Sequence, residues 1–358
     1  MDALNSNSNV YPDAGSAGGE RRYPVEFTAT AGEYFRIWIV NLALTIITLG
    51  VYSAWAKVRK KRYFYGHTRI DGEGFEYRAN PVAILKGRLI AVAAVILFYG
   101  SGKISWQLQL ASFGVGLFIS PWLIVRSMAF NAYNSAYRNI RLHFRSTYFQ
   151  CLKLIIGYGL LVIITLGLGY PYMKRRMVQF AAENHYYGVT QFAVADLKKI
   201  FLRIYSNAIG IGILLGIVAV VLTALGATTL GMEMRRPTGT FFIVQKLFGY
   251  VCYLGIFAYL RARVANATWN SITIGPVRFE CALRALEVYW LYLVNISAII
   301  LTVGLATPWA VIRTLRYRAE KMTVIATDAL DHFVAGESTQ VAAAGEEVSE
   351  MFDIGIGL

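Results

Sequence analysis

Seven stretches of the chain are long, apolar and free or nearly free of charged residues. About 20 helical residues cross the roughly 30 Å hydrocarbon core of a bilayer, so each stretch is long enough for a spanning helix. A water-soluble protein can bury one such helix, but seven would expose too much apolar surface to water. The stretches cover residues 37–56, 82–102, 106–125, 154–173, 204–232, 240–260 and 288–312.

The composition agrees with membrane insertion. Hydrophobic residues make up 56% of the 358 residues and charged residues only 16%, whereas soluble domains have about 25% charged residues. We therefore predict an all-α fold, namely a polytopic helical membrane protein with internal repeats and room for short hairpins in its basic loops. The expected parts are a disordered N-terminal tail at 1–33, a transmembrane domain at 34–318 and an acidic C-terminal tail at 319–358.

An internal repeat carries most of the information in the chain. Three copies follow the pattern T-x-G-x4-[WY]-x3-R and begin at Thr48, Thr165 and Thr302. Two looser copies keep [WY]-x3-R but lack Thr-x-Gly. A fixed pattern that recurs along a chain indicates a repeated structural unit. We call the two kinds strict and loose copies.

Each element of the repeat has a physical interpretation. The glycine permits a bend or a close helix approach, the aromatic ring favours the membrane interface, and the arginine one turn later can reach a phosphate. A plain membrane-anchoring helix end explains the same pattern, so both interpretations stay open. The candidate residues are the hinges Gly50, Gly167 and Gly304, the interfacial aromatics Trp55, Trp122, Tyr172, Tyr259 and Trp309, and the anion or headgroup contacts Arg59, Arg126, Arg176, Arg263 and Arg313.

A basic and aromatic segment with a short polar turn follows each arginine. In the first copy Asp71-Gly72 predicts a tight hairpin. The segment NLALTIITLGVYSAWAKVRKKRYFYGHTRIDGEGFEY closely resembles the signature of the YjgN family of bacterial inner-membrane proteins, built on a domain of unknown function. The resemblance extends over about residues 25–355. It implies a multi-pass location in the bacterial inner membrane, and it implies no established activity, cofactor or catalytic residue.

Topology is open between three arrangements. If all seven stretches cross, the basic residues divide almost evenly between the two sides, which is a poor positive-inside bias. If the three strict copies are re-entrant, 28 Lys and Arg share the cytoplasmic side against three outside. Only six residues separate Gly50 from Lys57, however, and such a short returning limb argues against deep re-entry. The third arrangement has two inverted three-segment repeats.

Recognisable catalytic or metal-binding chemistry is missing from the sequence. The three cysteines and four histidines are scattered, and no apolar stretch carries an interior carboxylate for ion coupling. We expect no enzyme, no cofactor and no nucleic-acid partner. The favoured function is transport or handling of an anionic small molecule or lipid, with anionic membrane lipids as partners. The alternative is a non-catalytic scaffold that recruits partners through its basic loops and its acidic tail, where a protein partner can dock.

Overall fold

The computed structural model describes residues 20–229, 239–327, 330–331 and 333–338. Within these residues ten short strands form one closed antiparallel barrel, in which the N-terminal strand pairs with the last strand and with β2. The prediction of an all-α fold is therefore wrong. The strands are β1 (Arg21–Phe27), β2 (Thr68–Ile70), β3 (Glu73–Tyr77), β4 (Ser135–Tyr137), β5 (Ile140–Phe144), β6 (His185–Tyr187), β7 (Thr190–Val194), β8 (Ile272–Ile274), β9 (Val277–Cys281) and β10 (Met322–Ala326).

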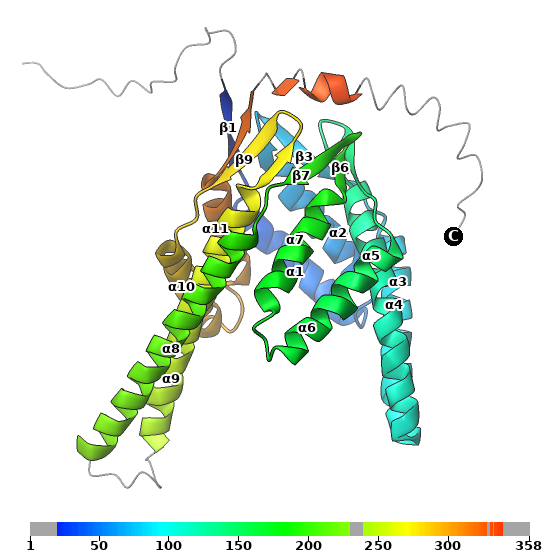
Figure 1. Cartoon of the computed structure of the whole chain (residues 1–358). Coiled ribbons are helices and arrows are strands. Elements are labelled where there is room, and N and C mark those ends of the chain that lie inside the picture. Colours follow the sequence, from blue (N-terminus) through cyan, green and yellow to red (C-terminus); the bar gives the residue numbers. More distant parts are fainter. Residues whose placement is uncertain (1–19, 230–238, 328–329, 332, 339–358) are drawn as a thin grey trace, which may run out of the picture.

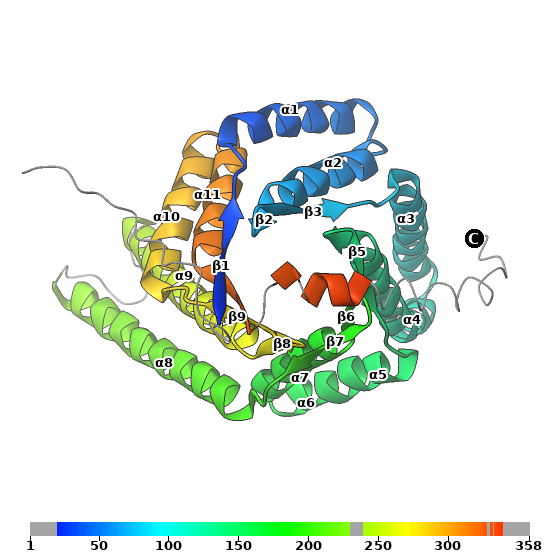
Figure 2. The ribbon, with the colours of Figure 1, turned by 90° about the horizontal axis from the view of Figure 1, so that it is seen from above.

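Five helical hairpins in the described residues extend from one end of the barrel (Figures 1 and 2). The first helix of each hairpin lies on the outside and the second lies nearer the centre, so we call them outer and inner helices. The outer helices are α1 (Ala31–Ile47), α3 (Pro81–Ile104), α8 (Lys198–Thr229), α10 (Ala285–Leu301) and a run of α5 (Tyr148–Leu152), the π-helical η1 (Lys153–Gly157) and α6 (Tyr158–Ile164). The inner helices are α2 (Ser53–Gly66), α4 (Trp106–Tyr133), α7 (Tyr170–Glu183), α9 (Gly239–Trp269) and α11 (Thr307–Glu320).

The hairpins and strands share one register. Each outer helix starts four residues after a barrel strand ends, as Ala31 does after Phe27. Each repeat aromatic lies thirteen residues before the next strand, as Trp55 does before Thr68. The repeat is thus a unit of outer helix, inner helix and strand pair. In the fifth unit the strand pair is made by β10 and β1, the two ends of the described fold.

Two of the predicted tails contain barrel strands. β1 lies within 1–33 and β10 lies within 319–358, so the folded part of the chain is longer than the hydrophobic pattern suggested. The predicted hairpin at Asp71-Gly72 is confirmed, because β2 pairs with β3 and both turn residues have positive φ. Positive φ at both positions is typical of the tight turns that join twisted strands.

The barrel interior is apolar. Tyr137 donates its hydroxyl to the Ile70 carbonyl at 2.8 Å, and Tyr187 donates to the Tyr137 carbonyl at 3.2 Å. Burial raises the pKa of Tyr137 to about 12. Phe333 and its neighbours close one end of an apolar cavity of about 310 Å³. The Glu337 carboxylate accepts the Val189 N–H at 2.9 Å and fixes this closing segment.

The three Thr-x-Gly copies form the same turn between outer and inner helix. In the first copy the Gly50 N–H donates to the Thr45 carbonyl at 2.8 Å, and the Tyr52 N–H donates to the Thr48 hydroxyl at 2.9 Å. Leu49 and Gly50 both have positive φ. This is a left-handed helix end joined directly to a capped helix start. The copies at Thr165 and Thr302 repeat these bonds.

Helix length divides the hairpins into two kinds. Among the described residues four helices are long and apolar enough to cross a membrane, and they are α3, α4, α8 and α9 of the loose copies. The apolar outer helices of the strict copies span only 17 residues each. The prediction of seven spanning-length segments is therefore corrected to four, because three stretches turn back at Thr-x-Gly. All five strand pairs lie at the same end of the helical hairpins (Figure 1). The re-entrant arrangement requires this, because it puts all basic loops on one side of the membrane.

We predict that Gly50→Ala destabilises the protein by about 1 kcal/mol or more, because the residue has a φ of +92° that an L side chain rarely adopts. The added methyl group meets no atom within 4 Å, so the cost comes from the backbone alone. The midpoint of thermal unfolding in detergent measures the effect. Gly87→Ala in α3 is the matched control, and its midpoint should stay or rise. Equal losses in both variants would contradict the role of the turn.

Candidate functional site

The five repeat arginines lie at equivalent positions of the five inner helices. Each lies one helical turn after its aromatic residue. In the two hairpins that enclose a cavity, α8–α9 and α10–α11, the arginine lines that cavity together with residues of the outer helix. The structure therefore distributes the predicted arginines over five separate hairpins and does not gather them into one site; Arg263 and Arg313 each line a cleft. The hinge glycines of the strict copies lie at the hairpin tips, between the outer and inner helices and at the end away from the barrel.

In two strict copies the arginine is bonded to its own outer helix. The Arg176 Nε donates to the Tyr158 hydroxyl at 3.0 Å, and the Arg313 guanidinium lies 3.4 Å from the Asn295 Oδ1. Arg313 also stacks over Trp309, with 5.2 Å from the guanidinium carbon to the ring centre. These arginines therefore help to join the two helices of their hairpins.

In the loose copies the arginine has a ring contact and nothing more. Arg126 lies over Trp122 and Arg263 over Tyr259, both at 5.9 Å. Within the described residues neither side chain has a hydrogen bond or an ion pair. Ala208 of α8 stands at the helix position that Asn295 has in α10, so α8 offers no polar partner there. These guanidinium groups are available to a ligand.

A second set of cations lies on the outer helices at the same level. The sixth residue of the outer helix is basic in four of the five described units, and the side chain is exposed in each. Within the described part of the chain none of these four side chains forms a hydrogen bond or an ion pair. Together with the five repeat arginines they form what we call the basic belt. The four residues are Arg36, Lys86, Lys153 and Arg203.

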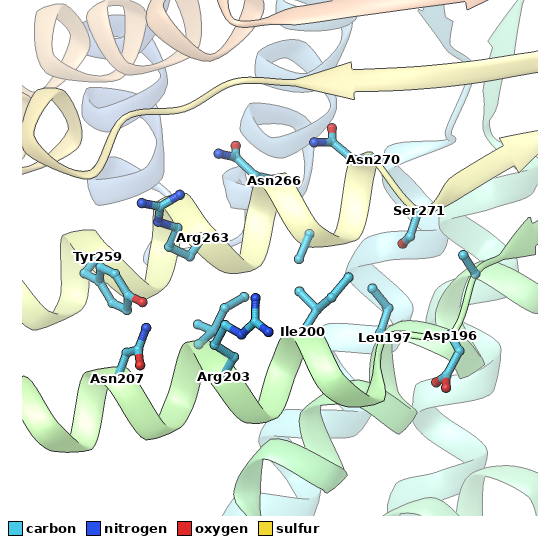
Figure 3. Close-up of a pocket in the computed structure, with 13 residues that line it drawn as sticks. Asp196, Leu197, Ile200, Arg203, Asn207, Tyr259, Arg263, Asn266, Asn270 and Ser271 are labelled. Atoms are coloured by element: carbon cyan, nitrogen blue, oxygen red, sulfur yellow. The ribbon is translucent and has the colours of Figure 1, made fainter.

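The cleft between α8 and α9 contains a cation from each set. It encloses about 570 Å³ and is lined by Arg203 and Asn207 from α8 and by Tyr259 and Arg263 from α9. Figure 3 shows Arg203 and Asn207 reaching from α8 towards α9, with Tyr259 directed back towards α8. The one carboxylate at its edge, Asp196, is already engaged by the Lys198 N–H at 3.0 Å and by Arg175 at 3.7 Å.

Two polar residues of this cleft have a structural role instead. The Asn266 side chain exchanges two hydrogen bonds of 2.9 Å with the backbone of Leu283, and Asn270 bonds the backbone of Cys281. Both therefore hold the link between β9 and α10. Among the described residues the guanidinium groups, the Asn207 amide and the Tyr259 hydroxyl line the cleft without such bonds.

The next hairpin has the same cleft with different chemistry. The cavity between α10 and α11 encloses about 630 Å³ and contains Trp309 and Arg313 where the α8–α9 cleft has Tyr259 and Arg263. Glu287 and Glu320 also line it, and Trp290 stands where α8 has Arg203. Two carboxylates offset its arginines, so the α8–α9 cleft is the more positive of the two.

Among the described residues no group of three or more His, Cys, Asp or Glu side chains could hold a metal ion.

Residues 22–351 match the family model described as a bacterial protein of unknown function, DUF898. The chain belongs to this family. It is similar to the inner membrane protein YjgN of Salmonella typhimurium (strain LT2), with 24% identity over 86% of this chain and 90% of the relative.

Shorter matches exist to two other family members. The YjgN protein of Escherichia coli O157:H7 is 38% identical over 20% of this chain and 17% of its own length. That of Escherichia coli K12 is 47% identical over 14% and 13%. No solved structure matches the chain. The predicted resemblance to the YjgN family is thus confirmed, and the family is named for a membrane location and for no activity.

Sequence reasoning missed the outer-helix half of the basic belt. Arg203 and its equivalents lie just before or just inside apolar stretches, where a single cation reads as an ordinary helix end. The signal that could have found them is their constant distance from the preceding strand, but apart from the hairpin at Asp71-Gly72 the strands were not predicted. Only the register of the fold shows that Arg36, Lys86, Lys153 and Arg203 are one position.

We predict that Asn295→Ala and Asn41→Ala, changes at equivalent positions of α10 and α1, have unequal effects. The Asn295 amide donates to the Ala310 carbonyl at 3.2 Å and to the Thr314 hydroxyl at 3.0 Å, so its loss should cost about 1–3 kcal/mol. The Asn41 Oδ1 is buried without a partner in the described structure, so Asn41→Ala should be neutral or stabilising. Unfolding midpoints in detergent compare the two variants, and a larger loss for Asn41→Ala would refute this account.

Proposed function

We propose that this protein is an integral inner-membrane protein that binds and positions anionic lipid headgroups, and that the α8–α9 cleft is its principal site. The role is non-enzymatic and needs no cofactor, and its partners are anionic membrane lipids of the cytoplasmic leaflet. The observation that carries the proposal is the pair Arg203 and Arg263, two exposed guanidinium groups beside one cavity that form no hydrogen bond or ion pair with the described residues.

The chemistry of the cleft suits a phosphate group. A guanidinium donates two parallel hydrogen bonds to phosphate oxygens, and such charge-assisted bonds are roughly twice as strong as neutral ones. Asn207 adds an amide donor, and Ile200 and Ile204 supply apolar wall for the start of an acyl chain. A cavity of about 570 Å³ is large enough for a headgroup with its glycerol.

The depth of the cleft supports a lipid over a free anion. Arg203 is the sixth residue of α8, about 8 Å along the helix from its start. The apolar part of α8 follows directly and is long enough to cross the hydrocarbon. This supports a position of the guanidinium at the boundary between water and acyl chains, where lipid phosphates lie.

The sidedness of the site follows from charge. All strand pairs belong to one barrel, so the basic loops lie on one side of the four long helices. Positive residues favour the cytoplasmic side, which also carries the anionic surface potential that attracts them. The scaffold alternative would be favoured by a bundle without cavities, whereas the described part of this chain has an open basic cleft between α8 and α9.

We predict that Arg203→Gln with Arg263→Gln lowers the retention of anionic lipid by more than tenfold. Each lost charge-assisted hydrogen bond should cost about 1.5 kcal/mol or more, which is about tenfold in affinity. The measurement is lipid analysis of protein purified from nanodiscs that contain equal amounts of phosphatidylglycerol and phosphatidylethanolamine. Arg203→Lys with Arg263→Lys keeps the charge but loses the fork, so it should show an intermediate loss.

The matched control is Arg21→Gln with Arg69→Gln. It removes the same charge from exposed positions on the barrel strands β1 and β2, away from the cleft. Its lipid retention should fall far less, because surface attraction is worth only about 1 kcal/mol per charge. If both double variants lose lipid equally, or neither loses any, the belt only orients the protein and the scaffold alternative gains support.

A further inference from the structure

We infer that the three strict hairpins are half-membrane anchors, which enter the acyl chains of the barrel-side leaflet and end near the bilayer midplane. This inference concerns α1–α2, α5–α7 and α10–α11, and it does not depend on the proposed headgroup site. The partner of this surface is the hydrocarbon of a single leaflet.

The tips of these hairpins expose apolar side chains that touch almost nothing in the protein. The residue between Thr and Gly is 95% exposed in the first copy and 93% exposed in the other two. The residue before the threonine is also exposed, at 74% for Ile47, 76% for Ile164 and 83% for Leu301. Three apolar tips with so little protein contact must meet another apolar medium. The tip residues are Leu49, Leu166 and Val303.

The backbone at the tips argues that the apolar side chain is required. All three tip residues have φ close to +50°, a left-handed conformation in which Gly, Asn and Asp are the favoured residues. Leucine is poorly suited to this conformation, and the β-branched Val303 is worse. In water an asparagine would be the better residue on both counts. The choice of Leu, Leu and Val therefore points to contact with lipid.

The lengths place the tips at the midplane. From Arg36 to Ile47 helix α1 rises by eleven residue steps, which is about 16 Å and about half of the roughly 30 Å hydrocarbon core. All outer helices start at the same distance from a barrel strand, but the strict ones end after 17 residues while α8 continues for 32. The strict hairpins therefore stop short of the far leaflet that the loose hairpins reach. On the returning limb Lys57 follows Gly50 by seven residues, and its long exposed side chain can extend from there to the polar interface.

The arrangement makes the protein asymmetric across the bilayer. Five hairpins displace lipid from the barrel-side leaflet, whereas in the described structure only α3–α4 and α8–α9 are long enough to displace lipid from the other. Lipids of the far leaflet can thus continue beneath three of the tips (Figure 1).

The experiment uses single-cysteine variants of the full chain at Leu49, Leu166 and Val303, in a background where the three native cysteines are replaced by alanine. A membrane-impermeant maleimide is applied to each face of sealed vesicles. We expect the tip cysteines to react at least about tenfold more slowly than exposed control cysteines, from either face of the vesicle, because a thiol in hydrocarbon does not ionise. A fluorophore attached in detergent before reconstitution should be quenched best by lipids that carry a nitroxide near the chain end.

Two controls at exposed residues bracket the result. Ile104→Cys, at the tip of the long α3–α4 hairpin and 77% exposed, should react from the far face. Arg69→Cys on β2 should react from the barrel face. Far-face reaction of the tip cysteines at the rate of Ile104→Cys would mean that the strict hairpins cross, and barrel-face reaction would mean that they do not enter the membrane. Either result overturns the inference.

A second set of positions protects the test against misfolding at the strained tips. Ile47, Ile164 and Leu301 each lie two residues earlier, at a regular helix end, and are 74%, 76% and 83% exposed. Cysteines there should give the same protection and the same deep quenching. Full reaction at these positions from either face would equally refute half-membrane entry.

Discussion

Main-chain pairing between β1 and β10 is the contact on which the arrangement of the whole molecule depends. It joins residues about 300 positions apart, from Arg21 with Ala326 to Pro24 with Thr323, and it closes the barrel. A closed barrel has no free edge, so every strand is fixed by two neighbours. Because each outer helix starts four residues after a strand, closure also sets five helical hairpins to one level. The basic belt exists because of this common level, since its members come from helices that otherwise have little sequence in common.

Within that frame a three-residue motif decides how deep each hairpin goes. Where Thr-x-Gly is present, the threonine hydroxyl and the left-handed pair end one helix and start the next without a loop, as at Thr48, Leu49 and Gly50. Where it is absent, α3 and α8 continue to spanning length. Ending a helix in hydrocarbon is costly unless its carbonyls and N–H groups are bonded. The turn satisfies these groups within the backbone and the threonine, which is what allows a tip to lie among acyl chains.

The sequence carried the membrane class, the repeat and its register, but not the barrel. Four of the strands have three residues, too few for an alternating pattern to stand out from a basic, aromatic loop. β1 and β10 were harder still, because they pair with each other across about 300 residues of chain and lie in segments whose polar composition predicted tails. Asp71-Gly72 was visible because turn chemistry is local. The arginines Arg59 to Arg313 were visible through spacing, whereas Arg203 became part of the site only through the fold.

The units share one geometry but differ in the residues that surround the repeat arginine. Some of these arginines bond the outer helix, and others have no such bond among the described residues. In α7 and α11 the repeat arginine bonds a polar residue of the outer helix, Tyr158 or Asn295. In α9 the matching outer-helix position is Ala208, so Arg263 has no such partner and the opposite helix supplies another cation, Arg203. Two cations that line one cleft repel each other, and an anion bound between them would offset that repulsion. In the proposed function a lipid phosphate at the polar end of the α8–α9 hairpin supplies this anion.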